Sequence, residues 1–278
     1  MLRRPHMRVR MRVKPLSLSL NRMIPNILTL LALCAGMTGI RFAIVGKFEA
    51  AVAAIIVAGV LDGLDGRIAR LLKGTSSFGA QLDSLSDFIS FGVAPAVILY
   101  MWTMSQLAGF GWAVVLCFAV CCGLRLARFN TQLGAELPAY AYNFFTGVPA
   151  PAGAGLVMVP MFASFEFGLA IFRSPFVNGV VLACVAALMV SRVPTFSFKR
   201  FRIPGEWVLP MLLVIGALAG FLTTEPWATL LVVGALYIGS IPLSIRSYRK
   251  LREAAEELRA GIIRGEEPQG TPREAPGE

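Results

Sequence analysis

The sequence predicts an all-α integral membrane protein, a bundle of about eight transmembrane helices. Of its 278 residues, 56% are hydrophobic and only 15% are charged, whereas about 25% of the residues of a soluble domain are charged. The apolar stretches also reach ~20 residues, which is the length of a helix that crosses a bilayer. A soluble protein with a very apolar core does not need stretches of that length.

Eight apolar stretches form a membrane domain over residues 24–245, with a core of six helices and two further C-terminal ones. We expect helices over residues 24–45, 49–71, 79–103, 109–130, 148–168, 175–192, 206–222 and 226–245. A basic cytoplasmic arm, residues 1–23, precedes this domain. A charged tail, residues 246–278, follows it and is expected to begin as a short solvated helix and to end in disorder.

The positions of the basic residues predict where the termini lie. Of the 26 Lys and Arg residues, only Arg41, Lys47 and Arg173 fall in segments that the order of spans places outside. Cytoplasmic loops carry the excess of Lys and Arg in membrane proteins, so we expect both termini in the cytoplasm. Topology and anionic headgroups then account for the net charge of +10, and a nucleic-acid partner is not expected.

Composition also disfavours several kinds of site. The single histidine, His6, lies in the basic arm, and none of the five cysteines has CxxC spacing. A zinc site, a disulfide framework and Ser-His-Asp catalysis are therefore unsupported.

All four aspartates of the chain lie between residues 62 and 87. Asp62 and Asp65 are spaced i,i+3, and Asp83 and Asp87 are spaced i,i+4, so each pair shares one face of a helix. Residues 73–77 (KGTSS) suit a turn between two antiparallel helices, on which the acidic faces converge. Carboxylates gathered in an apolar chain repel one another unless a cation lies among them.

This donor set indicates a hard divalent cation. Carboxylate oxygens without His or Cys favour Mg²⁺ or Mn²⁺, and four carboxylates with phosphate oxygens suffice to hold two ions ~4 Å apart. Two other interpretations stay open: a network of acid–arginine pairs at the membrane surface, and a cation path through a transporter. Transport, however, predicts acids spread through the depth of the bilayer, and here they are clustered.

Residues 62–87 match, at every fixed position, the pattern D-x-x-D-G-x-x-A-R, eight residues, G-x-x-x-D-x-x-x-D. The chain thereby resembles the CDP-alcohol phosphatidyltransferases, of which this pattern is the signature. The resemblance implies an integral membrane enzyme in which an alcohol displaces CMP from a CDP-linked lipid, with two divalent cations, Mg²⁺ or Mn²⁺, as cofactors. It also implies a homodimer in the membrane.

Four further stretches resemble the bacterial phosphatidylserine synthases of the integral-membrane type. They are RMIPNILTLL (22–31), CGLRLARFNT (122–131), FFTGVPAPAGAG (144–155) and SRVPTFSFK (191–199). This resemblance implies transfer of the phosphatidyl group of CDP-diacylglycerol to L-serine, at the cytoplasmic face of the inner membrane. A sister enzyme that uses glycerol 3-phosphate, inositol phosphate or choline is the alternative within the family.

The family motif implies roles for individual residues. Asp62, Asp65 and Asp83 would hold one cation and Asp62, Asp83 and Asp87 the other, and Asp87 would also be the general base on the serine hydroxyl. For CDP-diacylglycerol the motif implies contacts from Gly66, Arg70 and Ser76, with Gly79 on the same side. Asn26 and Thr29, at the cytoplasmic end of the first span, are further candidates for contacts to the cytosine or ribose. For Asn26 and Thr29, one turn apart beside Pro25, an ordinary helix start is the alternative.

Arg125, Arg128 and Asn130 are the candidates for binding the acceptor serine or the lipid phosphate. The two arginines are spaced i,i+3 near the end of the fourth span. Arginines there also occur simply because their side chains reach the headgroup region. Which residue selects serine is left open by the sequence.

Overall fold

The described part of the chain is helical apart from two short strands and the turns. The structure, a computed structural model, describes residues 20–72, 74, 76–132, 144–196, 206 and 208–264. The predicted basic arm before residue 20, Lys73 and Thr75 of the predicted turn, most of the loop before the fifth span, residues 197–205 and the end of the tail lie outside the described residues.

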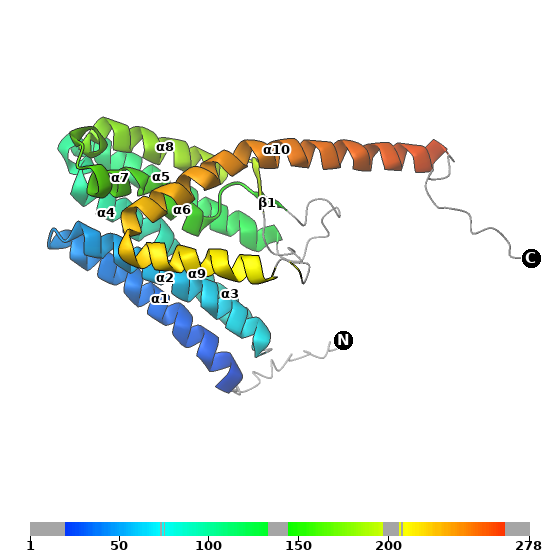
Figure 1. Ribbon diagram of the computed structural model, residues 1–278, viewed down its shortest axis with the longest axis horizontal. Helices are drawn as coiled ribbons and strands as arrows, with labels where there is room; N and C mark the ends of the chain where they lie inside the picture. The colour runs from blue at the N-terminus through cyan, green and yellow to red at the C-terminus, as the bar shows by residue number, and fades with distance from the viewer. Residues whose placement is uncertain are drawn as a thin grey trace, which may run out of the picture.

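The main helices follow the predicted order (Figure 1). They are α1 (Leu20–Ile44), α2 (Phe48–Leu71), α3 (Ser77–Asp87), α4 (Ala94–Trp102), α5 (Ala108–Gln132), α6 (Ala150–Val157), α7 (Val159–Phe167), α8 (Pro175–Val190), α9 (Val208–Thr224) and α10 (Pro226–Arg264). Short helical turns η1 (Phe88–Val93), η2 (Met104–Leu107) and η4 (Ala170–Arg173) and strands β1 (Phe144–Thr146) and β2 (Pro194–Phe196) complete them.

Five of the described helical segments are long and apolar enough to cross a membrane, and the chain is a multi-pass membrane protein. They are Met23–Ile44, Ser77–Trp102, Met104–Gln132, Ala150–Phe167 and Pro226–Glu257. Helices α8 and α9 are apolar but shorter, and α2 carries the charges of the aspartate motif. The count of eight spans and the cytoplasmic termini therefore stay predictions.

The third span is one rod built from three pieces. Helix α3 runs into the π-helix η1 directly after Asp87, and η1 runs into α4. Single-turn π segments are rare and recur at functional sites. Ser86 and Ser90 of this rod donate hydrogen bonds to the Thr29 and Ala32 carbonyls of α1, at 3.1 and 3.3 Å. Small polar side chains of this kind join helices in a bilayer.

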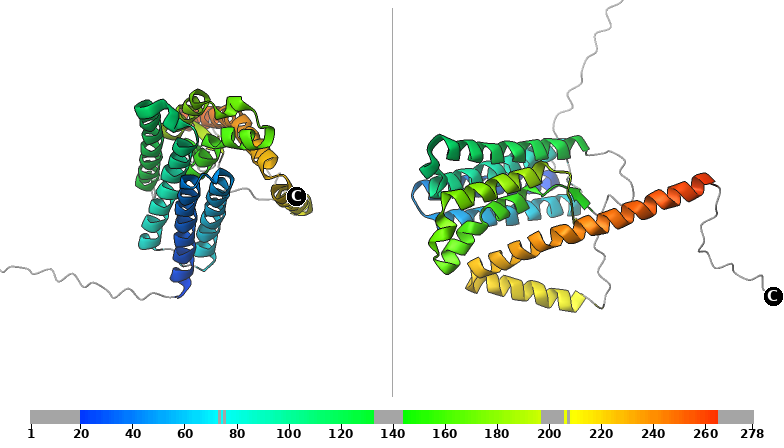
Figure 2. Two further views of the ribbon diagram at one scale, coloured as in Figure 1. Left: turned by 90° about the vertical axis from the view of Figure 1, so that its left-hand side faces the viewer. Right: turned by 90° about the horizontal axis from the view of Figure 1, so that it is seen from above.

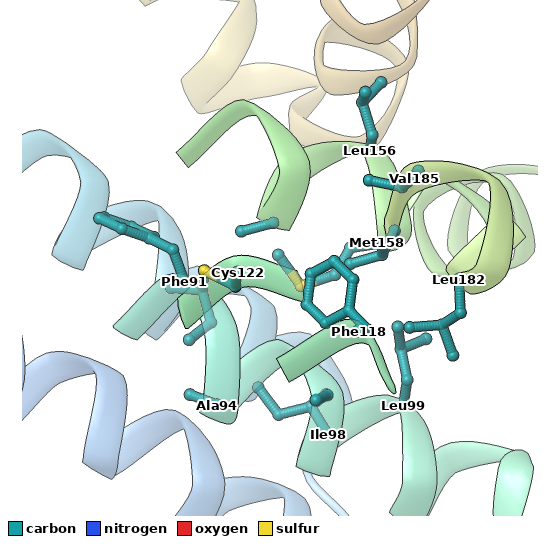
Figure 3. Packing of buried hydrophobic residues seen from close by; sticks show 14 of the residues in the cluster. Phe91, Ala94, Ile98, Leu99, Phe118, Cys122, Leu156, Met158, Leu182 and Val185 are labelled. Atoms are coloured by element: carbon teal, nitrogen blue, oxygen red, sulfur yellow. The ribbon is translucent and has the colours of Figure 1, made fainter. Parts of the chain in front are cut away.

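The core lies where the third span, α5, α6 and α8 meet (Figure 3). Phe91, Phe118 and Leu182 come from three of these elements, and each is at most 2% exposed. Gly92 of η1 packs on Cys122 of α5 so closely that a Cβ at Gly92 would lie 3.0 Å from the Cys122 sulfur. Tight packing at this point fixes the rod that carries Asp83 and Asp87.

Two helices of the structure differ in extent from the predicted spans. The fifth breaks at Met158 into α6 and α7, because Pro160 has no N–H to continue the hydrogen-bond ladder. The short charged helix expected from Arg246 is continuous with the eighth span, so that α10 runs for 39 residues. Figures 1 and 2 show α10 crossing the bundle and projecting beyond it, with α9 beside it at the edge of the molecule.

A small antiparallel ribbon, absent from the sequence prediction, joins two distant loops. Strand β1 pairs with β2 in the register Phe144–Phe196, Phe145–Thr195 and Thr146–Pro194. The next residue, Gly147, has φ +79°, and a Cβ there would lie 2.6 Å from the Met189 carbonyl oxygen. Only glycine fits this left-handed, crowded position.

Arg128 of α5 fastens this ribbon to the end of α8. Its guanidinium lies 2.8 to 3.2 Å from four carbonyl oxygens, those of Thr146, Met189, Val190 and Ser191. Three of these belong to the last residues of α8 and its C-cap, where helix carbonyls lack partners within the helix and attract a cation. We call this arrangement the Arg128 clamp.

Substitution of Arg128 by leucine is expected to lower the free energy of unfolding by ~3 kcal/mol or more, because hydrogen bonds to a charged group contribute roughly 1.5–3 kcal/mol each and four carbonyls lose their donor. Thermal unfolding followed by circular dichroism in detergent measures this. Arg173→Leu, at an exposed arginine of η4, is the control and should unfold like the wild type. Equal stability of Arg128→Leu and wild type would contradict a clamp.

Candidate functional site

A cavity of about 480 Å³ opens between α1, α2, α3, α5 and the β1–α6 segment. All four aspartates of the chain line it. So do several of the other residues that the sequence singled out, namely Asn26, Thr29, Gly66, Ser76, Gly79, Arg125 and Asn130. We call it the acidic cavity. The turn predicted after α2 is confirmed, since α2 ends at Leu71 and α3 begins at Ser77.

Three of the aspartates converge on one point. Carboxylate oxygens of Asp62, Asp83 and Asp87 all lie within 4.8 Å of one another. Within the described residues, the buried Asp87 Oδ1 has no hydrogen-bond partner. The described basic residues form no ion pair with any of the four aspartates, since the ion pair found among described residues joins Arg252 to Glu256. The interpretation of the acids as a surface salt-bridge network is therefore not supported.

The donor set fits a divalent cation. It contains oxygen ligands alone, which hard cations prefer, and one of these oxygens is buried and unpartnered. Such a group is costly to bury unless something binds it.

Asp65 lies in the same cavity but is held differently. Its Oδ2 accepts a hydrogen bond from the Thr29 hydroxyl at 2.5 Å, and both residues are only 4% exposed. The Thr29 hydroxyl, expected to read the nucleotide, is thus directed at Asp65. This bond fixes the orientation of the Asp65 carboxylate toward the cavity.

The two glycines of the motif do different things. At Gly79 a Cβ would lie 2.9 Å from the Asn26 Oδ1 and 3.1 Å from the Ser76 Oγ, so glycine lets α1 approach the start of α3. Ser76 caps α3, because its Oγ accepts a hydrogen bond from the Gly79 N–H at 3.0 Å. At Gly66 a Cβ would meet no atom within 4 Å, so this glycine leaves open space on the cavity side of the motif.

Of the three arginines expected at the site, the structure brings only Arg125 into the cavity. Its side chain is 8% exposed, and its Nε has no hydrogen-bond partner among the described residues. The guanidinium carbon lies 6.0 Å from the centroid of the Phe129 ring, a geometry that favours a cation. A buried arginine with an unpartnered donor, in a cavity with four carboxylates, is poised for a ligand that carries a negative charge.

The other two arginines lie elsewhere. Arg70 is exposed and does not line the cavity; its Nε donates to the Gly66 carbonyl at 3.0 Å. Arg128, expected to bind serine or lipid phosphate, is engaged in the clamp and does not line the cavity either. The sequence could not show this, because the carbonyls that Arg128 binds belong to segments far along the chain.

Several cavity residues, among them Ser84, Phe145 and Pro151, had no predicted role as site residues. Asn130 Nδ2 donates to the Ser84 Oγ at 2.9 Å, which ties α5 to α3 across the cavity. Phe145 and Pro151 form the wall on the ribbon side. Both belong to the stretch 144–155, which resembles the bacterial phosphatidylserine synthases. The sequence therefore indicated that this stretch matters, but it did not indicate which side chains line the cavity.

An apolar groove of about 240 Å³ adjoins the acidic cavity. Pro151 lines both. The groove runs between α2, η1, α6, α7 and α10, and its lining includes Ile55, Gly155, Leu230 and Tyr237. A polar, charged cavity thus opens beside a groove that suits a hydrocarbon chain.

Comparison with known proteins agrees with this geometry, since sequence models of one enzyme family match most of the chain. The sequence model of the CDP-alcohol phosphatidyltransferase family matches residues 22–191. A second one, CDP-alcohol phosphatidyltransferase 2, matches residues 206–242, which include α9 and the first part of α10.

Curated relatives cover most of the chain. The CDP-diacylglycerol–serine O-phosphatidyltransferase of Mycobacterium tuberculosis is 38% identical over 236 residues, 84% of this chain and 82% of the relative. The protein of the same name from Helicobacter pylori is 33% identical over 218 residues, 78% of this chain and 88% of the relative. The archaetidylserine synthase of Methanothermobacter thermautotrophicus is 34% identical over 175 residues, 61% of this chain and 68% of the relative. The chain therefore belongs to the CDP-alcohol phosphatidyltransferase family.

Proposed function

We propose that this chain transfers the phosphatidyl group of CDP-diacylglycerol to L-serine and releases CMP. The observation that carries the proposal is the convergence of the motif carboxylates on one cavity that also holds the unpartnered Arg125 and adjoins an apolar groove. The names of the curated relatives, which include serine O-phosphatidyltransferases from distant bacteria, support the choice of serine. A transporter is disfavoured because the acids gather at one end of their helices.

The cavity divides into parts that match the parts of the lipid nucleotide. Asn26, Gly66 and Ser76 line the part that would take the CDP group. Arg70, whose Nε donates to the Gly66 carbonyl, lies outside this lining. Gly79 leaves room for Asn26 and Ser76, and Thr29 orients the Asp65 carboxylate. The apolar groove would take one acyl chain, because its lining is apolar and Pro151 is common to the groove and the acidic cavity.

The four aspartates would hold two divalent cations, Mg²⁺ or Mn²⁺. When bound, such ions offset the negative charge of the pyrophosphate and of the departing CMP. Asp62, Asp83 and Asp87 are the convergent ligands, and Asp65, oriented by Thr29, completes the set.

In the reaction, the serine hydroxyl oxygen forms a bond to the phosphorus on the lipid side, and the bond from that phosphorus to the CMP oxygen breaks. The hydroxyl proton passes to the Asp87 carboxylate, which would act as the general base. Aspartates and arginine are positioned before the substrate binds, so little reorganisation accompanies the transfer.

Arg125 would bind the serine carboxylate. A guanidinium binds a carboxylate through two parallel hydrogen bonds, and Asn130 lies on the same wall of the cavity. Choline, which is a cation, has no group for Arg125. Glycerol 3-phosphate and inositol phosphate do carry an anionic group, so they remain the rivals that an acceptor panel must exclude.

The site is proposed to face the cytoplasm at the inner membrane. The distribution of Lys and Arg supports this orientation, and it gives water-soluble serine and CMP access to the cavity. The homodimer expected from the family stays a prediction.

The proposed function is tested with purified protein, CDP-diacylglycerol, Mg²⁺ or Mn²⁺, and serine, glycerol 3-phosphate, inositol phosphate or choline offered singly. We expect CMP release with serine alone. Release with another alcohol instead would reassign the chain to a sister enzyme, and no release with any of them would reject the enzyme proposal.

Asp87→Asn is expected to lower kcat by roughly 10²–10⁴-fold, the usual effect of losing a general base, while CDP still binds. Turnover is measured by CMP release and binding by calorimetry with CDP and the cation. Glu49→Gln, which removes a carboxylate from the first turn of α2, at the end away from the aspartates, is the control and should retain full activity. Normal turnover of Asp87→Asn would exclude Asp87 as the base.

Arg125→Lys is expected to raise the KM for serine by about tenfold or more, because lysine cannot make the bidentate contact. The KM for CDP-diacylglycerol should change little. Arg246→Lys, at an exposed arginine of α10, is the matched control. If the lipid KM rises and the serine KM does not, Arg125 binds the lipid phosphate instead.

Gly155→Leu is expected to fill the apolar groove, because a Cβ at Gly155 meets no atom within 4 Å. The KM for long-chain CDP-diacylglycerol should rise several-fold relative to that for a short-chain analogue. Gly220→Leu, on α9 in equally open space, should leave both values unchanged. An equal KM ratio in Gly155→Leu and wild type would place the acyl chain elsewhere.

A further inference from the structure

A second cleft, of about 420 Å³, lies between the segment after α8 and the charged half of α10. Arg192 stands on one wall, and Arg249 and Arg252 stand on the other. The two arginines of α10 are spaced i,i+3 and so share a helix face. None of the described residues that line this cleft is acidic. We call it the arginine cleft; it is separate from the acidic cavity and does not depend on the proposed reaction.

The walls of the arginine cleft are held in place by packing. Arg192 follows Ser191, whose carbonyl is bound in the Arg128 clamp. The Tyr248 ring of α10 contacts the Phe144 ring edge-on at 5.3 Å, and Phe144 stacks on Phe196 at 5.6 Å. These aromatic contacts fix α10 against the β1–β2 ribbon. Arginines far apart in the sequence are therefore kept on two sides of one space.

The floor of the cleft has a different character. Val193, Pro194 and Ile245 supply apolar surface, and Tyr248 adds an aromatic ring. Arg246, beside Ile245, is the first charged residue of α10. The cleft thus lies at the level where α10 passes from its apolar to its charged part, which is the level of lipid headgroups.

We propose that the arginine cleft binds an anionic phospholipid through its headgroup phosphate. Arginines bind phosphate oxygens through paired N–H groups, and basic pockets beside transmembrane helices take anionic headgroups. The apolar floor suits the glycerol backbone and the first methylenes of a lipid, which inorganic phosphate lacks. A zwitterionic lipid would bring a second cation among the arginines and is disfavoured.

The pair formed by Arg252 and Glu256 does not block this site. Their side chains are 58% and 61% exposed, with Nε and Oε1 2.8 Å apart. Ion pairs this exposed contribute little to stability, so a lipid phosphate competes with Glu256 at small cost. Arg192 and Arg249, which line the cleft from two different segments, carry the site.

The test uses the full chain in nanodiscs of phosphatidylcholine with increasing phosphatidylglycerol. Native mass spectrometry of the released protein counts the phosphatidylglycerol molecules that stay bound. Wild type is expected to retain one more than Arg192→Gln/Arg249→Gln, with an apparent affinity for that lipid roughly tenfold higher or more. The matched control is Arg246→Gln/Lys250→Gln, which removes equal charge from exposed neighbours that do not line the cleft.

The control pair should bind phosphatidylglycerol like the wild type, within about twofold. Equal loss in both pairs would mean that general positive charge, and not the cleft, attracts the lipid, and retention by the cleft pair would overturn the site. Displacement by millimolar inorganic phosphate, but not by chloride of the same ionic strength, would make it a site for free phosphate. Thermal unfolding checks that each variant is folded, and Arg249→Glu, exposed on α10, gives a second disruption of the cleft if the pair is unstable.

Discussion

The structure depends on keeping carboxylates of like charge together in an apolar protein. Oxygens of Asp62, Asp83 and Asp87 lie within 4.8 Å of one another, and no described basic residue forms an ion pair with them. Such a cluster is unfavourable without a cation, so the surrounding helices have to hold it in place. Hydrogen bonds from Ser86 and Ser90 fasten the third span to α1. This half of the bundle therefore has to be rigid, because the aspartates that it carries repel one another.

The opposite wall of the cavity is organised by a different interaction, the Arg128 clamp. It gathers three stretches that are separated in the sequence and that all resemble the same bacterial enzymes: residues 122–131, 144–155 and 191–199. Arg128 comes from the first of them, Thr146 from the second and Ser191 from the third. The clamp thus joins the three stretches at one point, because a single guanidinium binds a carbonyl of each of the other two. Phe145 and Pro151 line the cavity as a result.

The aspartates could be predicted from the sequence because local spacing determines which helix faces they share. The spans were recognisable for a similar reason, since length and apolar character are properties of one segment. The β1–β2 ribbon was not predictable: three residues show no periodicity, and the partners are about fifty positions apart. The same limit applies to Arg128, which was expected at the ligand. The sequence around an arginine near a helix end does not show whether its guanidinium binds a backbone carbonyl or a phosphate. The break at Met158 had a visible cause in Pro160, yet proline alone does not decide between a kink and a break.

Helix α10 has a consequence for how the protein sits in its membrane. At 1.5 Å per residue its 39 residues form a rod of ~58 Å, about twice the ~30 Å hydrocarbon thickness of a bilayer. The charged half cannot sink into lipid and the apolar half cannot leave it. The boundary between the two halves of α10 therefore fixes how deep the helix lies in the bilayer. Because α10 also lines the groove that adjoins the acidic cavity, its depth in the bilayer determines the height of that cavity relative to the water layer.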